Sequence, residues 1–273
     1  MDPNRFRELL SNHQKHAHVK VHDHGHAVRV VAYDQNGKIS RTMQGLTGRL
    51  RDCFFPNDPK RFSRYRKKAL GLIGGSSTRD GTRVHAWIRH RINCSSKRTC
   101  NCPRRPKGEP PVYVQRFFTD LQTLGFVPLQ AEVPVWDKKK NLMTLIDVIV
   151  KTPKNTLAVL EIKTGFNGSI DMATRTPKAR YLCSKAFSAK IPANLNTFRH
   201  KHFLQVLIGA MLFNGCYKRA TGISAEEAWV VYLNNTIKEG AYRPQETTTS
   251  WIPAHMVEWT SSPLKMAEIF MSV

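Results

Sequence analysis

Residues 145–165, LIDVIVKTPKNTLAVLEIKTG, contain two apolar runs separated by a short polar segment. Each run carries one acidic residue, Asp147 in the first and Glu161 in the second. Ionised carboxylates are rarely buried in proteins unless they are paired with a positive charge or bind a metal ion. The stretch therefore predicts two neighbouring strands whose acidic side chains are neutralised by a cation.

The length of the turn decides whether the two acids face each other. Side chains alternate along a strand, which places Asp147 on the same face as Ile149. By the same rule Glu161 shares a face with Lys163. If residues 153–155 form a three-residue loop, Asp147 lies directly opposite Glu161, whereas a loop of two or four residues sends Glu161 to the other face. Two opposed carboxylates repel each other, and a Mg²⁺ ion would make the pairing favourable.

The charge of the chain predicts a polyanionic partner. Lys and Arg number 43 against 20 Asp and Glu among 273 residues, a formal net charge of +23. Such an excess favours phosphate binding, and DNA, RNA or an acidic membrane surface would each satisfy it. With 41% hydrophobic residues the chain can form a core. It has neither an apolar run of about 20 residues nor a secretory signal, so we expect a soluble, intracellular protein that does not enter a membrane, in the nucleus, mitochondrion or cytoplasm.

The six cysteines are expected to be reduced thiols, since they are scattered through a long chain without an export signal. The segment CSSKRTCNC places Cys94, Cys100 and Cys102 close together, and His90 is a candidate fourth ligand for zinc. The spacing contains no C-x-x-C pair, so structural zinc there is the less favoured interpretation.

Residues 1–75 are interpreted as a basic N-terminal region that could grip DNA. A hairpin is predicted between residues 28–33 and 38–43, with the turn at Asn36 and Gly37. The five histidines of residues 16–26 are typical of a flexible, solvated stretch, with transition-metal binding as the alternative. The basic and aromatic residues 58–71 suit either phosphate contact or an exposed helix. The glycines and serines of residues 71–81 predict a linker or turn.

The remainder, residues 76–273, predicts an α/β fold with a mixed central β-sheet flanked by helices. Hydrophobic periodicity predicts helices at 82–92, 112–124 and 198–215. It predicts strands at 126–136, 142–151, 156–163 and 226–235.

The order of Asp147, thirteen further residues and then Glu161-Ile162-Lys163 resembles the PD-(D/E)xK nuclease motif. Ile146 stands where the motif has proline. Three other stretches, between residues 76 and 235, resemble the RecB-like and lambda-exonuclease-like branch of that superfamily. His85 follows Gly81 in a G-x-x-x-H helix, AEVPVW resembles the strand that carries a Glu before the motif Asp, and HFLQ resembles the Y-x-x-Q helix. In these stretches the corresponding residues are Glu132, Gln205 and, in place of Tyr, His202.

The resemblance implies a restriction-endonuclease-like fold and a metal-dependent DNA nuclease that leaves 5′-phosphates. It implies one or two Mg²⁺ or Mn²⁺ ions held by Asp147, Glu161, His85 and the carbonyl of Ile162. Lys163 would position the attacking water and Gln205 would orient Lys163 or a phosphate. Members of the family are often exonucleases or end-processing enzymes of DNA replication, recombination and repair, which act on single strands or duplex ends.

The DNA strand is expected to follow a basic segment after the motif. The residues assigned to this path are Arg175, Lys178, Arg180 and Lys185, with Arg199 and Lys201 as weaker candidates. Two alternatives remain open at this point: a non-catalytic nucleic-acid-binding protein that retains the nuclease fold, and a zinc-stabilised RNA-binding protein.

Overall fold

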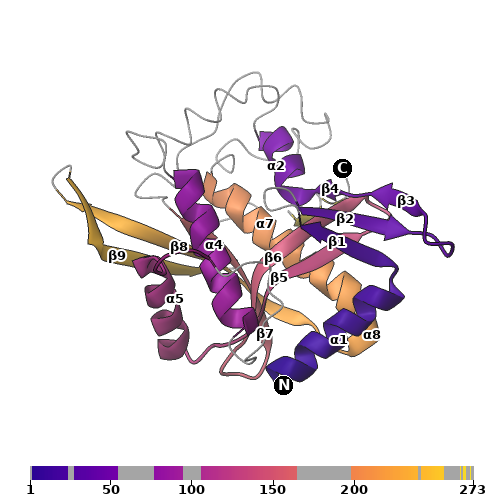
Figure 1. The fold of residues 1–273 in the computed structure, drawn as a ribbon, viewed down its shortest axis with the longest axis horizontal. Helices are drawn as coiled ribbons and strands as arrows, with labels where there is room; N and C mark the ends of the chain where they lie inside the picture. Colours follow the sequence, from indigo (N-terminus) through magenta and orange to yellow (C-terminus); the bar gives the residue numbers. More distant parts are fainter. Residues whose placement is uncertain are drawn as a thin grey trace.

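The structure is a computed structural model, shown in Figure 1. It describes residues 2–23, 28–54, 77–94, 106–164, 198–238 and 241–254, together with residues 265, 267, 268 and 271. In these residues a mixed six-stranded β-sheet is flanked by helices, and a small three-stranded sheet lies beside it (Figure 1). The predicted α/β class with a mixed sheet between helices is therefore confirmed.

The large sheet contains both parallel and antiparallel neighbours. Its strands are β4 (Gln44–Gly45), β5 (Val127–Asp137), β6 (Leu142–Lys151), β7 (Leu157–Thr164), β8 (Ala225–Lys238) and β9 (Ala241–Pro253). Their order is β4-β6-β7-β8-β9, and β5 pairs with β6. The pairs β4–β6 and β7–β8 are parallel, and the other pairs are antiparallel. The sequence predicted β5 to β8, but it did not predict β9, whose threonines and glutamine lack a clear apolar alternation.

Two hydrophobic clusters cover the two faces of this sheet. Along β7, Val159 belongs to the first cluster, whereas Ala158 and Leu160 belong to the second, as strand alternation requires. The first cluster takes side chains from α1 (Pro3–His16), α2 (Leu46–Phe54) and α7 (Phe198–Phe213). The second takes them from α4 (Ser77–Cys94) and α5 (Val112–Thr123). The site described below therefore lies between α4 on one face and α7 on the other.

The N-terminal region packs into the same core as the rest of the chain. Phe6 and Leu10 of α1 are fully buried in the first cluster, which also contains Phe203 of α7. The small sheet consists of β1 (Val19–Asp23), β2 (Val28–Tyr33) and β3 (Ile39–Thr42). The hairpin of β2 with β3 was predicted, and Gly37 has the positive φ of 75° that its turn requires. The expectation of a flexible histidine stretch is wrong for His16, which ends α1, and for residues 19–23, which form β1 and pair with β2; residues 24–27 lie outside the described residues.

Helix α4 begins earlier than the sequence predicted. Residues 77–81 were assigned to a linker because of the glycines and serines of residues 71–81, but they form the first turn of α4. Gly81 is accommodated there for a packing reason, since a Cβ at this position would come within 2.9 Å of Oγ1 of Thr164 at the end of β7. Thus Gly81 lets α4 approach the end of β7 closely.

The end of α5 agrees with the sequence-based prediction, whereas the state of one cysteine does not. Gly125 ends α5 with a φ of 69°, as predicted. Cys94, the last residue of α4, is disulfide-bonded, so the expectation of a reduced thiol is wrong for it and it offers no thiolate to zinc. Cys100 and Cys102 lie outside the described residues. Among the described helices, none is both long enough and apolar enough to span a bilayer.

Candidate active site

The β6–β7 turn has the predicted length. The amide of Thr152 donates to the carbonyl of Thr156 at 2.9 Å, and that of Asn155 donates to the carbonyl of Thr152 at 2.9 Å. Asn155 adopts a φ of 64°, which asparagine tolerates in turns. The loop therefore consists of residues 153–155, and Val148 pairs with Leu160 in the predicted register.

Beyond that pair, β6 and β7 separate, so Asp147 is not paired with Glu161, although the three-residue loop predicted that they would lie directly opposite. Strand β7 continues beside β8 as far as Thr164, whereas the other end of β6 pairs with β4 at Leu142 and Met143. Asp147 lies where the two strands part, and its Oδ2 accepts a hydrogen bond of 2.7 Å from the amide of Ile162. The resemblance implied a role for the carbonyl of Ile162, but the group that contacts Asp147 is its N–H.

Asp147 also lies opposite β5, at a point where the alternation of side chains is broken on both β5 and β6. Ala131 pairs with Val148 and Val133 with Ile146, so Glu132 stands opposite Asp147. Residues two apart share a face in a regular strand, yet Ala131 and Val133 belong to different core clusters. The same holds for Ile146 and Val148 on β6.

Glu132 lies at the point on β5 where the face changes. Its φ of 57° is the left-handed conformation, which is rare in a strand and costly for a residue with a side chain. On β6, Asp147 contacts His85 of α4, whereas Ile149 packs in the first cluster with α7. The prediction that Asp147 shares a face with Ile149 is therefore wrong, because it assumed an unbroken alternation.

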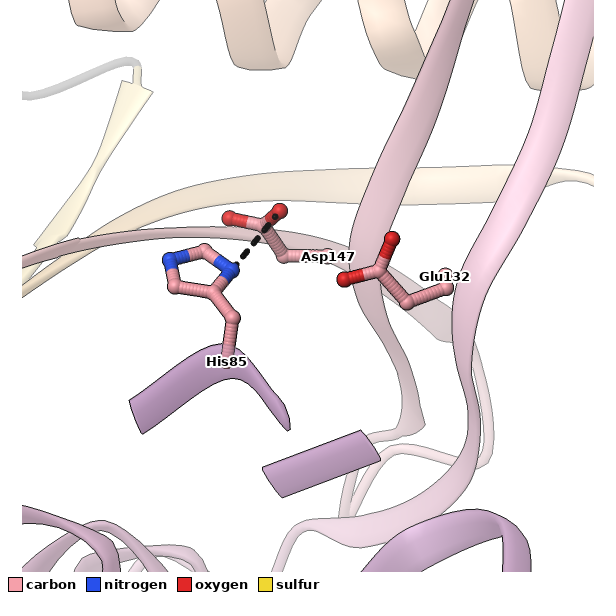
Figure 2. A group of neighbouring side chains, drawn as sticks. All are labelled: His85, Glu132 and Asp147. Atoms are coloured by element: carbon pink, nitrogen blue, oxygen red, sulfur yellow. Dashed lines mark ion pairs between the residues drawn. The ribbon is translucent and has the colours of Figure 1, made fainter. Parts of the chain in front are cut away.

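His85, Glu132 and Asp147 converge from three separate elements (Figure 2). One potential ligand atom from each lies within 4.8 Å of the others. The Nδ1 of His85 is 3.4 Å from Oδ1 of Asp147, and the two side chains retain 29% and 12% of their accessible surface. In Figure 2 the imidazole of α4 and the carboxylate of Glu132 both point toward Asp147. We name this group the α4 cluster.

The α4 cluster has the donors of a divalent-metal site. A bound Mg²⁺ or Mn²⁺ ion lies about 2.0–2.2 Å from oxygen ligands, so a small inward movement of the three side chains would let one ion contact them all. Two carboxylates would neutralise its charge. The imidazole nitrogen favours Mn²⁺ and other transition metals more than it favours Mg²⁺.

A second group lies on the α7 side of the same opening and is named the α7 cluster. The ammonium of Lys163 forms an ion pair with Oε1 of Glu161. Gln205 of α7 donates to that same oxygen at 2.6 Å, and its own Oε1 accepts from Lys163 at 3.3 Å. Glu161 retains only 5% of its accessible surface, so its carboxylate is held by these two neighbours. The predicted shared face of Glu161 and Lys163 is confirmed by their common contact with Gln205.

Next to this cluster is a residue pair that the sequence did not reveal. His202, one turn before Gln205, has its Nδ1 3.1 Å from the hydroxyl of Tyr232, and both side chains are buried. Tyr232 of β8 stands beside Lys163 in the parallel register. Its hydroxyl gave no signal in the sequence, because the tyrosine belongs to an apolar strand whose pairing partner could not be identified.

The two clusters are coupled electrostatically. Burial lowers the pKa of His85, but attraction and hydrogen bonding by Asp147 outweigh it and raise the pKa to about 9. Burial and repulsion by Asp147 raise the pKa of Glu161 to about 7, against the attraction of Lys163. Burial tends to raise the pKa of Asp147, but the charges of His85 and Lys163 overcome it and lower that pKa. Asp147 is therefore stabilised as a carboxylate by His85 and Lys163, whereas the carboxyl group of Glu161 binds a proton more readily than an exposed one.

The predicted DNA-binding residues are only partly placed by the structure. Four of them lie outside the described residues: Arg175, Lys178, Arg180 and Lys185. Lys201 is buried, with 5% of its surface accessible, which argues against its contact with a DNA strand. Glu132 was noted in the sequence but not assigned as a ligand; a single acid within an apolar strand was the available signal.

No known protein-family model matches the chain, and no curated protein matches it significantly.

Proposed function

We propose that the protein is a metal-dependent DNA nuclease of the PD-(D/E)xK type with a restriction-endonuclease-like core. One observation carries the proposal. His85, Asp147, Glu161, Lys163 and Gln205, which are far apart in the sequence, gather where β6 and β7 separate, in two electrostatically coupled clusters. Strongly perturbed carboxyl and imidazole groups of this kind concentrate at functional sites.

The α4 cluster would hold a divalent cation, with the carboxylate of Glu161 next to it. When bound, such an ion would stabilise the negative charge that develops on a phosphate during hydrolysis. Its arrival would displace the proton of His85, since only the neutral imidazole can bind a metal. The raised pKa of His85 shows how strongly this position favours a positive charge.

The residues of the α7 cluster would act on the attacking water and on the phosphate. Lys163 presents an ammonium that can position a water molecule and offset charge on the phosphate oxygens. Gln205 contacts both Lys163 and Glu161 and thereby fixes the direction of both side chains. Glu161, which accepts hydrogen bonds from both Lys163 and Gln205, would offer a carboxylate to a proton of the attacking water.

DNA binding would rest on the charge of the whole chain. The formal net charge of +23 favours a polyanion, and release of counterions from phosphates supplies affinity that does not depend on the catalytic groups. Loss of a catalytic residue should therefore leave DNA affinity nearly unchanged.

The test is a cleavage assay on linear and circular DNA, single- and double-stranded, with Mg²⁺, Mn²⁺ or EDTA. We expect cleavage that requires the metal, is faster with Mn²⁺ and disappears in Asp147→Ala. DNA binding without cleavage under every condition would instead support a non-catalytic binding protein. Stoichiometric zinc with a preference for RNA would support the third interpretation. Cleavage that persists in Asp147→Ala would remove Asp147 from the metal site.

A further inference from the structure

A pocket of about 920 Å³ lies away from the two clusters. It is an open pocket bounded by the end of α1, the β5–β6 turn and the segment η3 (Asn214–Lys218), which continues into α8 (Arg219–Thr221). Figure 1 shows α1 and α8 next to each other at this corner of the molecule. A volume of this size is within the range of pockets that bind small organic molecules.

The lining of the pocket is rich in basic residues. Three consecutive lysines, Lys138 to Lys140, line it together with Arg219, and two acidic residues, Asp137 and Glu268, are found among the described lining residues. Two of these lysines are fixed in position by hydrogen bonds: Lys138 Nζ donates to the carbonyl of Ala17 at 2.8 Å, and Lys140 Nζ donates to that of Met271 at 2.9 Å. An ammonium has three donors, so each retains donors for a ligand.

Lys139 differs from its two neighbours. Its side chain is exposed at the pocket and makes no hydrogen bond or ion pair with any residue that the structure describes. It lies between two fixed ammonium groups, where the mutual repulsion of three lysines would favour an anion. The lysine triplet therefore suits a phosphate group.

The pocket lining also contains apolar side chains. Met211, Leu212 and Met271 belong to it and are called the methionine wall, and methionine side chains adapt to flat ligands. Trp136 also lines the pocket, with the ring of His13 stacked on it at a centroid distance of 6.2 Å and an angle of 10°. The lysines suit a phosphate and the apolar side chains suit a base, and a nucleotide contains both.

Gly215 also lines the pocket, and there is free space next to its Cα atom. This glycine belongs to η3, a π-helical segment, and such segments are frequent at functional sites. A Cβ added to Gly215 would meet no atom within 4 Å, so the space in front of it is free. The backbone is thus shaped to leave room for a ligand at the pocket wall.

We propose that this pocket binds one nucleotide unit, with its phosphate at Lys138–Lys140 and its base against the methionine wall. The unit can be a free nucleotide or a nucleotide within a DNA strand, since both present the same phosphate and base. The pocket is distinct from the α4 cluster: Leu142, at the pocket end of β6, is five residues from Asp147, or about 16 Å along a strand. Nucleotide binding here does not require that the chain cleaves DNA.

The experiment measures binding by calorimetry in EDTA, so that no metal is bound at the α4 cluster. The probes are deoxyadenosine 5′-monophosphate, an eight-residue oligothymidylate and inorganic phosphate. Gly215→Phe fills the pocket, and Gly48→Phe, at a glycine of α2 that also has open space around its Cβ, is the matched control. Lys139→Ala removes a pocket charge without breaking a described contact, and Lys154→Ala removes an exposed charge elsewhere.

We expect Gly215→Phe to weaken binding of the mononucleotide at least about tenfold and Lys139→Ala to weaken it about threefold to tenfold, with both controls unchanged. Loss confined to the oligothymidylate would support the pocket as a site for a nucleotide within a strand. Equal binding of phosphate and mononucleotide would overturn the role of the apolar wall. Unchanged binding of all probes in both pocket variants would overturn the proposal, whether or not the protein cleaves DNA.

Discussion

The two clusters at the β6–β7 opening are built in different ways. The α7 cluster follows regular rules, because Glu161 and Lys163 are two apart on an ordinary strand and both reach Gln205 on the helix above them. The α4 cluster depends on an irregularity, since Glu132 adopts a left-handed φ and both neighbouring strands change face beside it. Regular geometry orients one half of the site and a strained backbone orients the other.

The difference extends to what each cluster can do. The α4 cluster combines two carboxylates with an imidazole and can exchange a proton for a cation. The α7 cluster already contains its own cation, Lys163, which is paired with Glu161. We therefore assign metal binding to the α4 cluster and orientation of the reacting groups to the α7 cluster.

The largest expected effect separates these two roles. Asp147→Asn keeps an acceptor for the amide of Ile162 but loses the charge that binds a metal, so Mn²⁺ affinity and cleavage should both fall, the latter more than about a thousandfold. Lys163→Ala should slow cleavage by about 10²–10⁴-fold with Mn²⁺ affinity retained. Metal calorimetry and single-turnover cleavage measure the two quantities. Equal loss of metal affinity in both variants would contradict the division of roles.

A smaller effect is expected for Gln205→Ala. Gln205 does not contact the α4 cluster but orients Glu161 and Lys163, and loss of such a supporting contact commonly costs about 10–100-fold in activity. The rate constant for cleavage should fall while Mn²⁺ affinity stays the same. Gln14→Ala is the control, because Gln14 also donates to a buried partner, the hydroxyl of Tyr217, at a distance from the site. A comparable loss of rate in Gln14→Ala would indicate a general loss of stability instead.

The α7 cluster could be predicted from the sequence because its strand is regular. Alternation placed Glu161 with Lys163 and the three-residue turn set the register, whereas Gln205 was identified through the resemblance of HFLQ to the Y-x-x-Q helix. The α4 cluster could be predicted only in part. His85 was found through the G-x-x-x-H pattern, but nothing in the sequence AEVPVW indicates that Glu132 has a positive φ.

Prediction of the fold was limited in the same way, because local sequence patterns do not contain tertiary contacts. Strong apolar patterns predicted β5 to β8 and α7, whereas β9 was missed because its pairing with β8 stabilises a strand of low intrinsic preference. The start of α4 was missed because Gly81 and the serines before it favour a turn locally. Its close approach to Thr164 is a tertiary contact that local propensity does not contain.

The protonation of the two clusters gives a pH dependence for the metal-free protein. The folded pKa of His85, about 9, is above its ordinary 6.5, so its stabilisation is complete below pH 6.5 and is lost as pH rises through 9. The pKa of Glu161, raised from 4.5 to about 7, also makes stability decline as pH rises through that interval. The free energy of unfolding should therefore fall between pH 5 and pH 9, with the loss from Glu161 in the lower part of this interval and the loss from His85 in the upper part.

Two measurements check this expectation. Urea unfolding in EDTA gives the pH dependence of stability, and NMR of the His85 ring gives its pKa directly. Asp147→Asn should lower the pKa of His85, because burial then acts without its main opposing charge. Added Mn²⁺ should stabilise the protein more at pH 8.5 than at pH 6, since the ion displaces protons. A His85 pKa that does not respond to Asp147→Asn would mean that the two side chains do not interact.

The smallest expected effect tests the irregular backbone of the α4 cluster. Both Glu132→Ala and Glu132→Gly remove the carboxylate, so both should weaken Mn²⁺ binding. Their stabilities should differ, because a left-handed φ costs a residue with a Cβ about 1–2 kcal/mol and costs glycine little. Glu132→Gly should therefore unfold at a higher urea concentration than Glu132→Ala, by about 1 kcal/mol in free energy.

Asn155 provides the control for this comparison, since it has a similar φ of 64° in the β6–β7 turn and does not belong to either cluster. Asn155→Gly should likewise be more stable than Asn155→Ala, but neither change should affect Mn²⁺ binding. If glycine is favoured over alanine at position 155 but not at 132, Glu132 is not held in the left-handed conformation. Asp147 would then follow the face of Ile149, as strand alternation alone predicts, and the α4 cluster would not assemble around it.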